Sequence, residues 1–140
     1  MANLALVHGA GASNLSFAYV RHLLSHHAHI ISPNYVIDQD PQWLIENLGN
    51  EIHEAFGDDP ITYVGHSFGG VLGGFLCADR RLNITDLITA GTPWGGSRFA
   101  KWLGMMNPKN PLFTNMSPGS NLIQKLKQAE WNGRHTNLVL

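Results

Sequence analysis

Cysteine, charged residues and long apolar runs are all scarce in this 140-residue sequence, and each shortage excludes a class of protein. The single cysteine, Cys77, cannot form an internal disulfide, so we expect a reducing compartment and a cytoplasmic location. No window approaches the roughly 18 uninterrupted apolar residues that a membrane-spanning helix needs. The N-terminus lacks the basic start and the apolar run of a signal peptide, and its pattern predicts a core strand instead.

Charged residues make up 14% of the sequence, and the formal net charge is −1 at pH 7. The chain has neither a basic stripe nor an acidic tail, so it lacks the charge pattern of a nucleic-acid-binding protein. A hydrophobic content of 44% over 140 residues is enough for one compact core and too little for two. We therefore predict a single domain over residues 1–140 and no nucleic acid among its partners.

Short apolar runs alternate with longer amphipathic ones, which is typical of a βαβ series. The pattern predicts strands at residues 3–8, 29–33, 61–64, 84–90 and 137–140. It predicts helices at residues 14–27, 41–56, 68–80 and 120–131. Asp40 and Pro41 open the second of these helices in the expected N-cap and first-turn order. Its predicted buried stripe consists of Trp43, Leu44, Leu48, Ile52 and Phe56. Because parallel strands with short crossovers connect right-handedly, we predict a doubly wound, mostly parallel α/β sheet of about five strands in the order 2-1-3-4-5. This order places the turns after the first and third strands side by side, at the carboxyl edge where ligands bind.

The turn at residues 65–69, Gly-His-Ser-Phe-Gly, carries the strongest chemical signal. A serine hydroxyl is a poor nucleophile unless it is presented openly to a base and its oxyanion meets preorganised donors. In a nucleophile elbow the serine occupies a strained strand-to-helix turn, so glycine is needed two positions before and two after it. Gly65 and Gly69 fill those positions. We predict Ser67 as a catalytic nucleophile, the alternative being a glycine-rich turn whose serine caps the helix.

A second glycine-rich turn, His-Gly-Ala-Gly at residues 8–11, falls beside Ser67 in the predicted strand order. Its backbone can aim an N–H at a developing oxyanion, and the residue after the nucleophile supplies a second N–H. We predict Ala10 and Phe68 as these donors. A dinucleotide-binding fingerprint is disfavoured, because Asn14 occupies the third glycine position and no acidic residue lies at the expected spacing.

Three segments, taken in order, resemble the landmarks of lipase-type α/β-hydrolases: residues 6–10, 65–70 and 91–97. The last, Gly-Thr-Pro-Trp-Gly-Gly-Ser, is similar to a segment of bacterial triacylglycerol lipases and of GPI inositol-deacylase-like lipases, as are residues 116–120. The resemblance covers nearly the whole chain. It implies carboxylic-ester hydrolysis through an acyl-enzyme on Ser67, an oxyanion hole at Ala10 and Phe68, and no cofactor.

In this family the acid and the histidine of the catalytic triad follow two successive strands that come after the lid. This sequence reaches residue 140 within the first of those strands, so neither residue is present at its expected place. We therefore expect a truncated hydrolase core that is weak or inactive alone. His8 is the one conceivable base within the chain, although a structural role is favoured. We expect His66 to pack and orient the turn, and His135 to lie at the amino edge, away from Ser67. His22 and His26 stand one helical turn apart without a third ligand, so we predict no metal site.

The segment at residues 97–119 is irregular and rich in aromatic residues and methionines, which suits a lid over acyl chains of varied shape. The alternative is a helix that simply packs on the sheet. The lid interpretation favours a lipid or medium-chain ester over a polar ester as the small-molecule substrate. The candidate substrate-binding residues are His8, Trp94, Trp102, Met105, Met106 and Phe113.

Three functions stay open at this point. The favoured one is a serine esterase or lipase acting through Ser67. The second is a thioesterase or acyltransferase on the same fold, and the third is a binding module without catalysis that has kept the turn.

Overall fold

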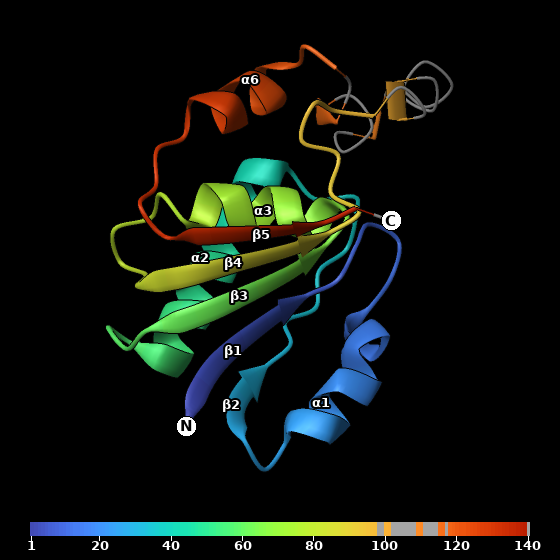
Figure 1. Ribbon diagram of the computed structural model, residues 1–140. Helices are drawn as coiled ribbons and strands as arrows, with labels where there is room; N and C mark the ends of the chain where they lie inside the picture. Colours follow the sequence, from blue (N-terminus) through green and yellow to red (C-terminus); the bar gives the residue numbers. More distant parts are fainter. Residues whose placement is uncertain (98–99, 102–108, 111–114, 117, 140) are drawn as a thin grey trace.

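The computed structural model describes residues 1–97, 100–101, 109–110, 115–116 and 118–139. Five strands form one sheet in the order β2-β1-β3-β4-β5, and every neighbouring pair is parallel (Figure 1). The strands are β1 (Ala2–Val7), β2 (Ala28–Ile31), β3 (Ile61–His66), β4 (Ile84–Ala90) and β5 (Arg134–Leu138). The predicted fold class and the predicted strand order are therefore confirmed.

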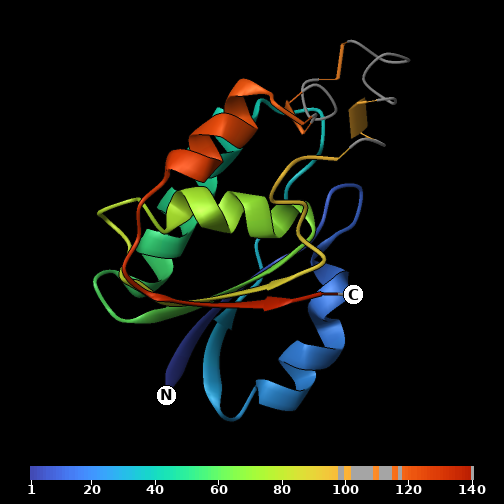
Figure 2. The same cartoon turned by 45° about the horizontal axis from the view of Figure 1, so that its top comes forward.

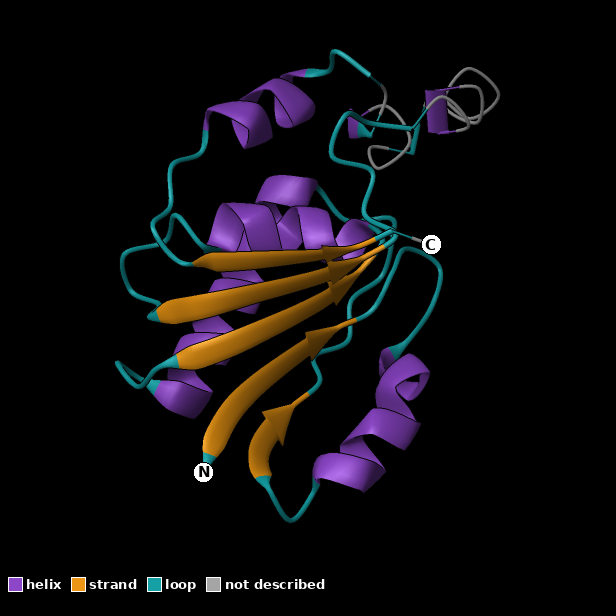
Figure 3. Cartoon of the chain, in the orientation of Figure 1, coloured by secondary structure: helices purple, strands orange, loops and turns teal. Residues whose placement is uncertain are grey.

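Helices lie on both sides of this sheet. The described part of the chain contains the 3-10 helix η1 (Asn14–Phe17) and the helices α1 (Ala18–Leu24), α2 (Pro41–Phe56), α3 (Phe68–Leu76) and α6 (Asn121–Gln128). Helices α3 and α6 lie on one side of the sheet and α1 on the other (Figure 2). Because all strands run the same way, the turns that follow them gather at one edge (Figure 3).

Several predicted boundaries of strands and helices are wrong, including the start of β5. It begins at Arg134 rather than at residue 137, and all of its residues are exposed. An edge strand of this kind is held by its backbone pairing with β4, so its side chains need not follow an apolar pattern. The predicted helix at 14–27 is divided because Phe17, with φ −102° and ψ 9°, interrupts the helical backbone.

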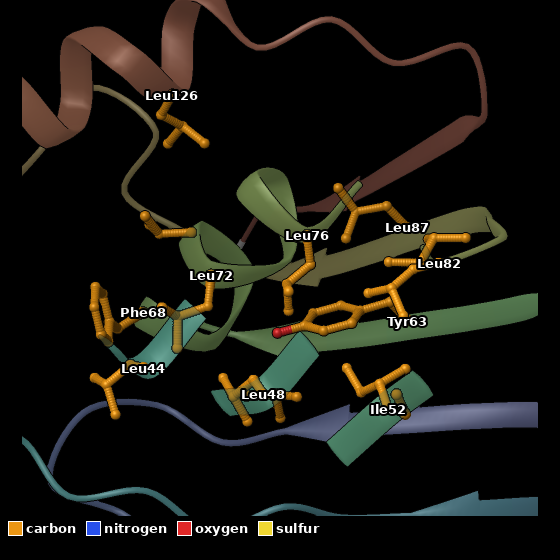
Figure 4. Packing of buried hydrophobic residues seen from close by; sticks show 14 of the residues in the cluster. Leu44, Leu48, Ile52, Tyr63, Phe68, Leu72, Leu76, Leu82, Leu87 and Leu126 are labelled. Carbon is orange, nitrogen blue, oxygen red and sulfur yellow. The ribbon is translucent and has the colours of Figure 1, made fainter. Parts of the chain in front are cut away.

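Helix α2 begins where its capping residues predict. The Asp40 carboxylate accepts hydrogen bonds from the backbone N–H of Gln42 (2.9 Å) and of Trp43 (3.3 Å), and Pro41 occupies the first turn. The buried face of the helix carries Leu44, Leu48 and Ile52, which Figure 4 labels, and also Phe56. Trp43, which we expected in this stripe, is instead 52% exposed.

Helix α3 approaches the sheet unusually closely. A Cβ added to Gly73 would overlap the ring of Tyr63 on β3, and Leu72 and Leu76 of the same helix are fully buried beside that ring (Figure 4). The Tyr63 hydroxyl donates a 2.7 Å hydrogen bond to the carbonyl of Gly69. Glycine in a helix interior costs about 1 kcal/mol relative to alanine. At Gly73 the missing side chain leaves room for the Tyr63 ring, whose hydroxyl bond to Gly69 holds the start of α3 against the sheet.

Candidate active site

Ser67 stands between β3 and α3 in a strained conformation. Its φ is 51° and its ψ is −119°, and it is the one non-glycine residue with a positive φ in the described part of the chain. Such positions cost on the order of 1–3 kcal/mol and cluster at functional sites. The Ser67 side chain makes no capping hydrogen bond, so the interpretation of this serine as a helix cap is wrong.

Backbone contacts hold this turn in place. The Ser67 N–H donates to the carbonyl of Ala90 (2.8 Å) at the end of β4, and the Gly70 N–H donates to the carbonyl of Ser67 (3.0 Å). A Cβ on Gly65 would lie 2.5 Å from the nitrogen of Gly70. A Cβ on Gly69 would lie 2.5 Å from the carbonyl oxygen of His8 and even closer to that of Val7. The two glycines therefore allow the backbone contacts that a nucleophile elbow requires.

The turn after β1 lies directly beside Ser67, as the strand order predicts. A Cβ on Gly9 would be 3.2 Å from the Cβ of Ser67. Neither the backbone N–H of Ala10 nor that of Phe68 has an acceptor within the described residues. The Phe68 N–H also belongs to the first turn of α3, where the helix dipole favours negative charge. Both amides thus lack an acceptor within the described residues and lie on the two segments that meet at Ser67.

The His8 side chain holds the turn after β1 through buried contacts and does not reach the surface. The side chain is fully buried, its Nε2 accepts the Tyr35 N–H (3.3 Å), and its Nδ1 lies 2.7 Å from the carbonyl oxygen of Gly9. The Nδ1 contact with a carbonyl oxygen and the Nε2 contact with an N–H fit the Nδ1–H tautomer, in which both ring nitrogens are engaged. This geometry corrects the suggestion that His8 binds substrate, and it supports the structural role over that of a base.

Tyr35 is a site residue that the sequence analysis missed. Its ring stacks on His8 with centroids 4.2 Å apart, its hydroxyl donates to the carbonyl of His8 (2.7 Å), and its edge meets the ring of Phe68 at 6.1 Å. Burial raises the pKa of this hydroxyl, so it remains a hydrogen-bond donor. Tyr35 thereby links the two segments that carry the Ala10 and Phe68 amides.

We expect Tyr35→Phe to lower the free energy of unfolding by about 1 kcal/mol, because it deletes one partly buried hydrogen bond and keeps the ring. Urea denaturation measures the change. Tyr19→Phe is the matched control, since Tyr19 is 72% exposed and should show no effect. Equal midpoints for the Tyr35 variant and the parent protein would contradict this role.

Trp94 lies away from Ser67, at the contact between α3 and α6. Its ring meets His135 edge-on at 5.1 Å and lies against Gly74. It lines a 170 Å³ cavity together with Leu126 and Trp131. Its indole N–H is buried without a partner in the described residues. These contacts indicate a packing residue.

The other candidate substrate-binding residues, Trp102, Met105, Met106 and Phe113, lie outside the described residues, as does most of the lid segment.

The remaining histidines supply no base in this arrangement. His135 pairs with Leu87 rather than with the carboxyl end of β4, and its Nε2 lies 2.9 Å from the Thr89 hydroxyl. Partial burial lowers its pKa. His66 is exposed, so the expectation that it packs in the turn is wrong. Among the described residues, no histidine or carboxylate hydrogen-bonds to the Ser67 hydroxyl.

Cys77 is not a rival nucleophile. It follows α3 and is half-buried, and burial raises the pKa of its thiol to about 12. A thiol with so high a pKa is almost wholly protonated at neutral pH, and the thiolate is the reactive form.

The parallel sheet, the strained serine turn after β3 and the adjoining turn after β1 together define the α/β-hydrolase fold. No protein-family model and no curated protein matches this sequence. Solved structures do match. Phospholipase PlaB from Legionella pneumophila is 12% identical, with a TM-score of 0.82 over 99% of this chain and 39% of that one.

Two further structures share the fold. Mature lipase BlEst2 from Bacillus licheniformis is 18% identical, with a TM-score of 0.68 over 97% of this chain and 64% of that one. The NocB thioesterase domain is 13% identical, with a TM-score of 0.65 over 99% of this chain and 71% of that one. The chain thus spans about two fifths of the phospholipase and just under two thirds of the lipase. None of the helices in the described residues is long and apolar enough to cross a membrane.

Proposed function

We propose that Ser67 is the nucleophile of a serine hydrolase that cleaves carboxylic esters. The observation that carries the proposal is the Ser67 turn, where a serine is held at positive φ next to two backbone amides without acceptors. An ordinary turn has no need of such strain, whereas a presented nucleophile does. The matching structures, a phospholipase and a lipase among them, agree with ester chemistry on this fold.

In the proposed reaction the Ser67 oxygen attacks the ester carbonyl carbon and its proton passes to a general base. The carbonyl oxygen becomes negative and accepts hydrogen bonds from the N–H groups of Ala10 and Phe68. When the intermediate collapses, the bond to the alcohol breaks, and the base returns the proton to the departing oxygen. Water then attacks the acyl-enzyme with help from the same base, releasing the acid and restoring Ser67.

We propose that the general base and its acidic partner come from outside these 140 residues, since no described residue engages the Ser67 hydroxyl. The matching structures are longer than this chain and leave room for such a segment. Serine hydrolases without their base lose several orders of magnitude in rate, while the oxyanion hole sustains a residual activity. The 140 residues alone should therefore react slowly at Ser67.

For the substrate, we propose a lipid or medium-chain ester, based on the apolar composition of residues 97–119. The cytoplasmic location and the lid itself stay predictions.

A probe and substrate panel tests the proposed function. The folded chain is incubated with a fluorophosphonate probe and with p-nitrophenyl esters from acetyl to lauroyl, alongside matched acyl thioesters. We expect one phosphonyl adduct per chain by mass spectrometry and slow cleavage that favours esters over thioesters. A preference for thioesters would indicate the thioesterase alternative. No adduct on the folded protein after prolonged exposure would indicate a binding module and overturn the proposal.

A further inference from the structure

Helix α1 and the preceding η1 present apolar side chains to solvent. Leu15 is 75% exposed, Tyr19 is 72% exposed and Leu23 is 54% exposed. Tyr19 and Leu23 are four residues apart in α1, a spacing that places helical side chains on one face, and Leu15 lies in the 3-10 turn that leads into this helix. We call these three residues the α1 stripe. Exposed apolar side chains that gather in one place mark interaction sites more often than singly scattered ones do.

The segment that carries the α1 stripe contains no acidic side chain. All ten acidic residues of the chain lie at or after Asp38, so residues 1–37 contain no carboxylate side chain. The same stretch contains Arg21 and five histidines. The molecule therefore carries a formal charge of +1 on this part of the chain and an acidic remainder. This asymmetry is complementary to an anionic surface.

A hollow of about 420 Å³ lies between α1 and β2, next to the α1 stripe. Its lining consists of Ala18, Arg21, His22, Ser25, Ala28 and Ile30. Arg21 makes no ion pair within the described residues. A guanidinium group binds phosphate oxygens through two parallel hydrogen bonds, so the hollow offers a phosphate group a cationic partner without a competing carboxylate.

Hydrogen bonds attach the segment that carries the α1 stripe to the loop after β2, close to the proposed active site. The Asn14 N–H donates to the side chain of Asn34 (2.7 Å), and its amide group donates to the carbonyl of Ser32 (3.1 Å). These bonds fasten η1 to the loop after β2, while the turn that precedes η1 adjoins Ser67. The loop and helix beyond it add two more exposed apolar side chains, Val36 and Trp43. Helix α1 lies on the side of the sheet away from α3 and α6 (Figure 2).

We propose that η1 and α1 dock this protein on an anionic lipid surface. Leu15, Tyr19 and Leu23 enter the apolar boundary of the lipid layer, and Arg21 binds a lipid phosphate at the hollow. Helices with an apolar face and cationic neighbours bind lipid interfaces in this way, and anionic lipids strengthen the binding. Docking of this kind would bring Ser67 close to lipid esters, and this role of the surface rests on the proposed function. The binding of the surface to lipid does not depend on the activity of Ser67.

Vesicle co-sedimentation of the full chain tests the proposal. Vesicles of pure phosphatidylcholine are compared with vesicles of phosphatidylcholine and phosphatidylglycerol in equal parts. We expect binding to the anionic vesicles to weaken at least roughly fivefold in the combined variant Leu15→Ser, Tyr19→Ser, Leu23→Ser. Arg21→Gln should lose most of the preference for the anionic vesicles. Val139→Ser is the matched control, because Val139 is 87% exposed at the other end of the chain and should bind unchanged.

Three outcomes would overturn the docking surface. These are no binding by the parent protein, equal binding to both vesicle types, and parent-like binding by the combined variant. A parent dimer that the combined variant converts to monomer, seen by analytical ultracentrifugation, would assign the α1 stripe to a second copy instead. All variants are checked for folding by circular dichroism.

Failure of docking and failure of the proposed function are distinguishable. Ser67→Ala should bind the anionic vesicles like the parent protein. The stripe variants should keep the parent rate of fluorophosphonate labelling in the absence of lipid.

Discussion

Replacing Ser67 with alanine is expected to reduce covalent labelling by a fluorophosphonate probe at least roughly 100-fold, because the variant lacks the oxygen that attacks phosphorus. The fold should survive the change. The Ser67 side chain makes no capping hydrogen bond, and alanine keeps the same Cβ in the turn. Mass spectrometry of the adduct measures labelling, and urea denaturation measures stability.

A second serine serves as the control for this prediction. Ser16 is exposed in η1, and Ser16→Ala should label at the parent rate. Labelling of the Ser67 variant at the parent rate would assign the reactive group to another residue. A slow parent rate would agree with a base that comes from outside the chain, whereas a fast rate would require a base among these 140 residues.

The strand order and the serine turn could be predicted from the sequence because both depend on local signals. Each central strand is a short apolar run, and the handedness of parallel crossovers leaves few ways to arrange such runs. The turn is a contiguous motif whose glycines serve contacts close by. A Cβ on Gly65 would meet residues only four and five positions later in the chain.

The partners of these segments could not be predicted, because they come from distant parts of the chain. His8 is held by Tyr35, 27 residues away, and nothing in the segment around Tyr35 signals a ring that stacks on His8. β5 was misplaced because an edge strand pairs through its backbone, which leaves no apolar alternation to detect. Trp43 was misplaced because helical periodicity does not distinguish the edge of a buried face from its centre.

Gly69→Ala is expected to be the most damaging single substitution of those considered. The new Cβ would lie 2.5 Å from the carbonyl oxygen of His8 and closer still to that of Val7, and both are backbone atoms of β1 and its turn. No rotamer change can relieve a clash with backbone, so α3 must move away from β1. We expect a loss of at least about 3 kcal/mol in the free energy of unfolding, or failure to fold.

Gly95→Ala is the matched control, because a Cβ at Gly95 meets nothing within 4 Å and its backbone φ is not positive. Its urea midpoint should equal that of the parent protein, while that of Gly69→Ala falls. An unchanged midpoint for Gly69→Ala would mean that α3 and β1 are not in contact here. The contact between α3 and β1 matters for function as well as for stability. It fixes the distance between the Phe68 amide on α3 and the Ala10 amide after β1, so a Gly69→Ala protein that still folds should label more slowly at Ser67.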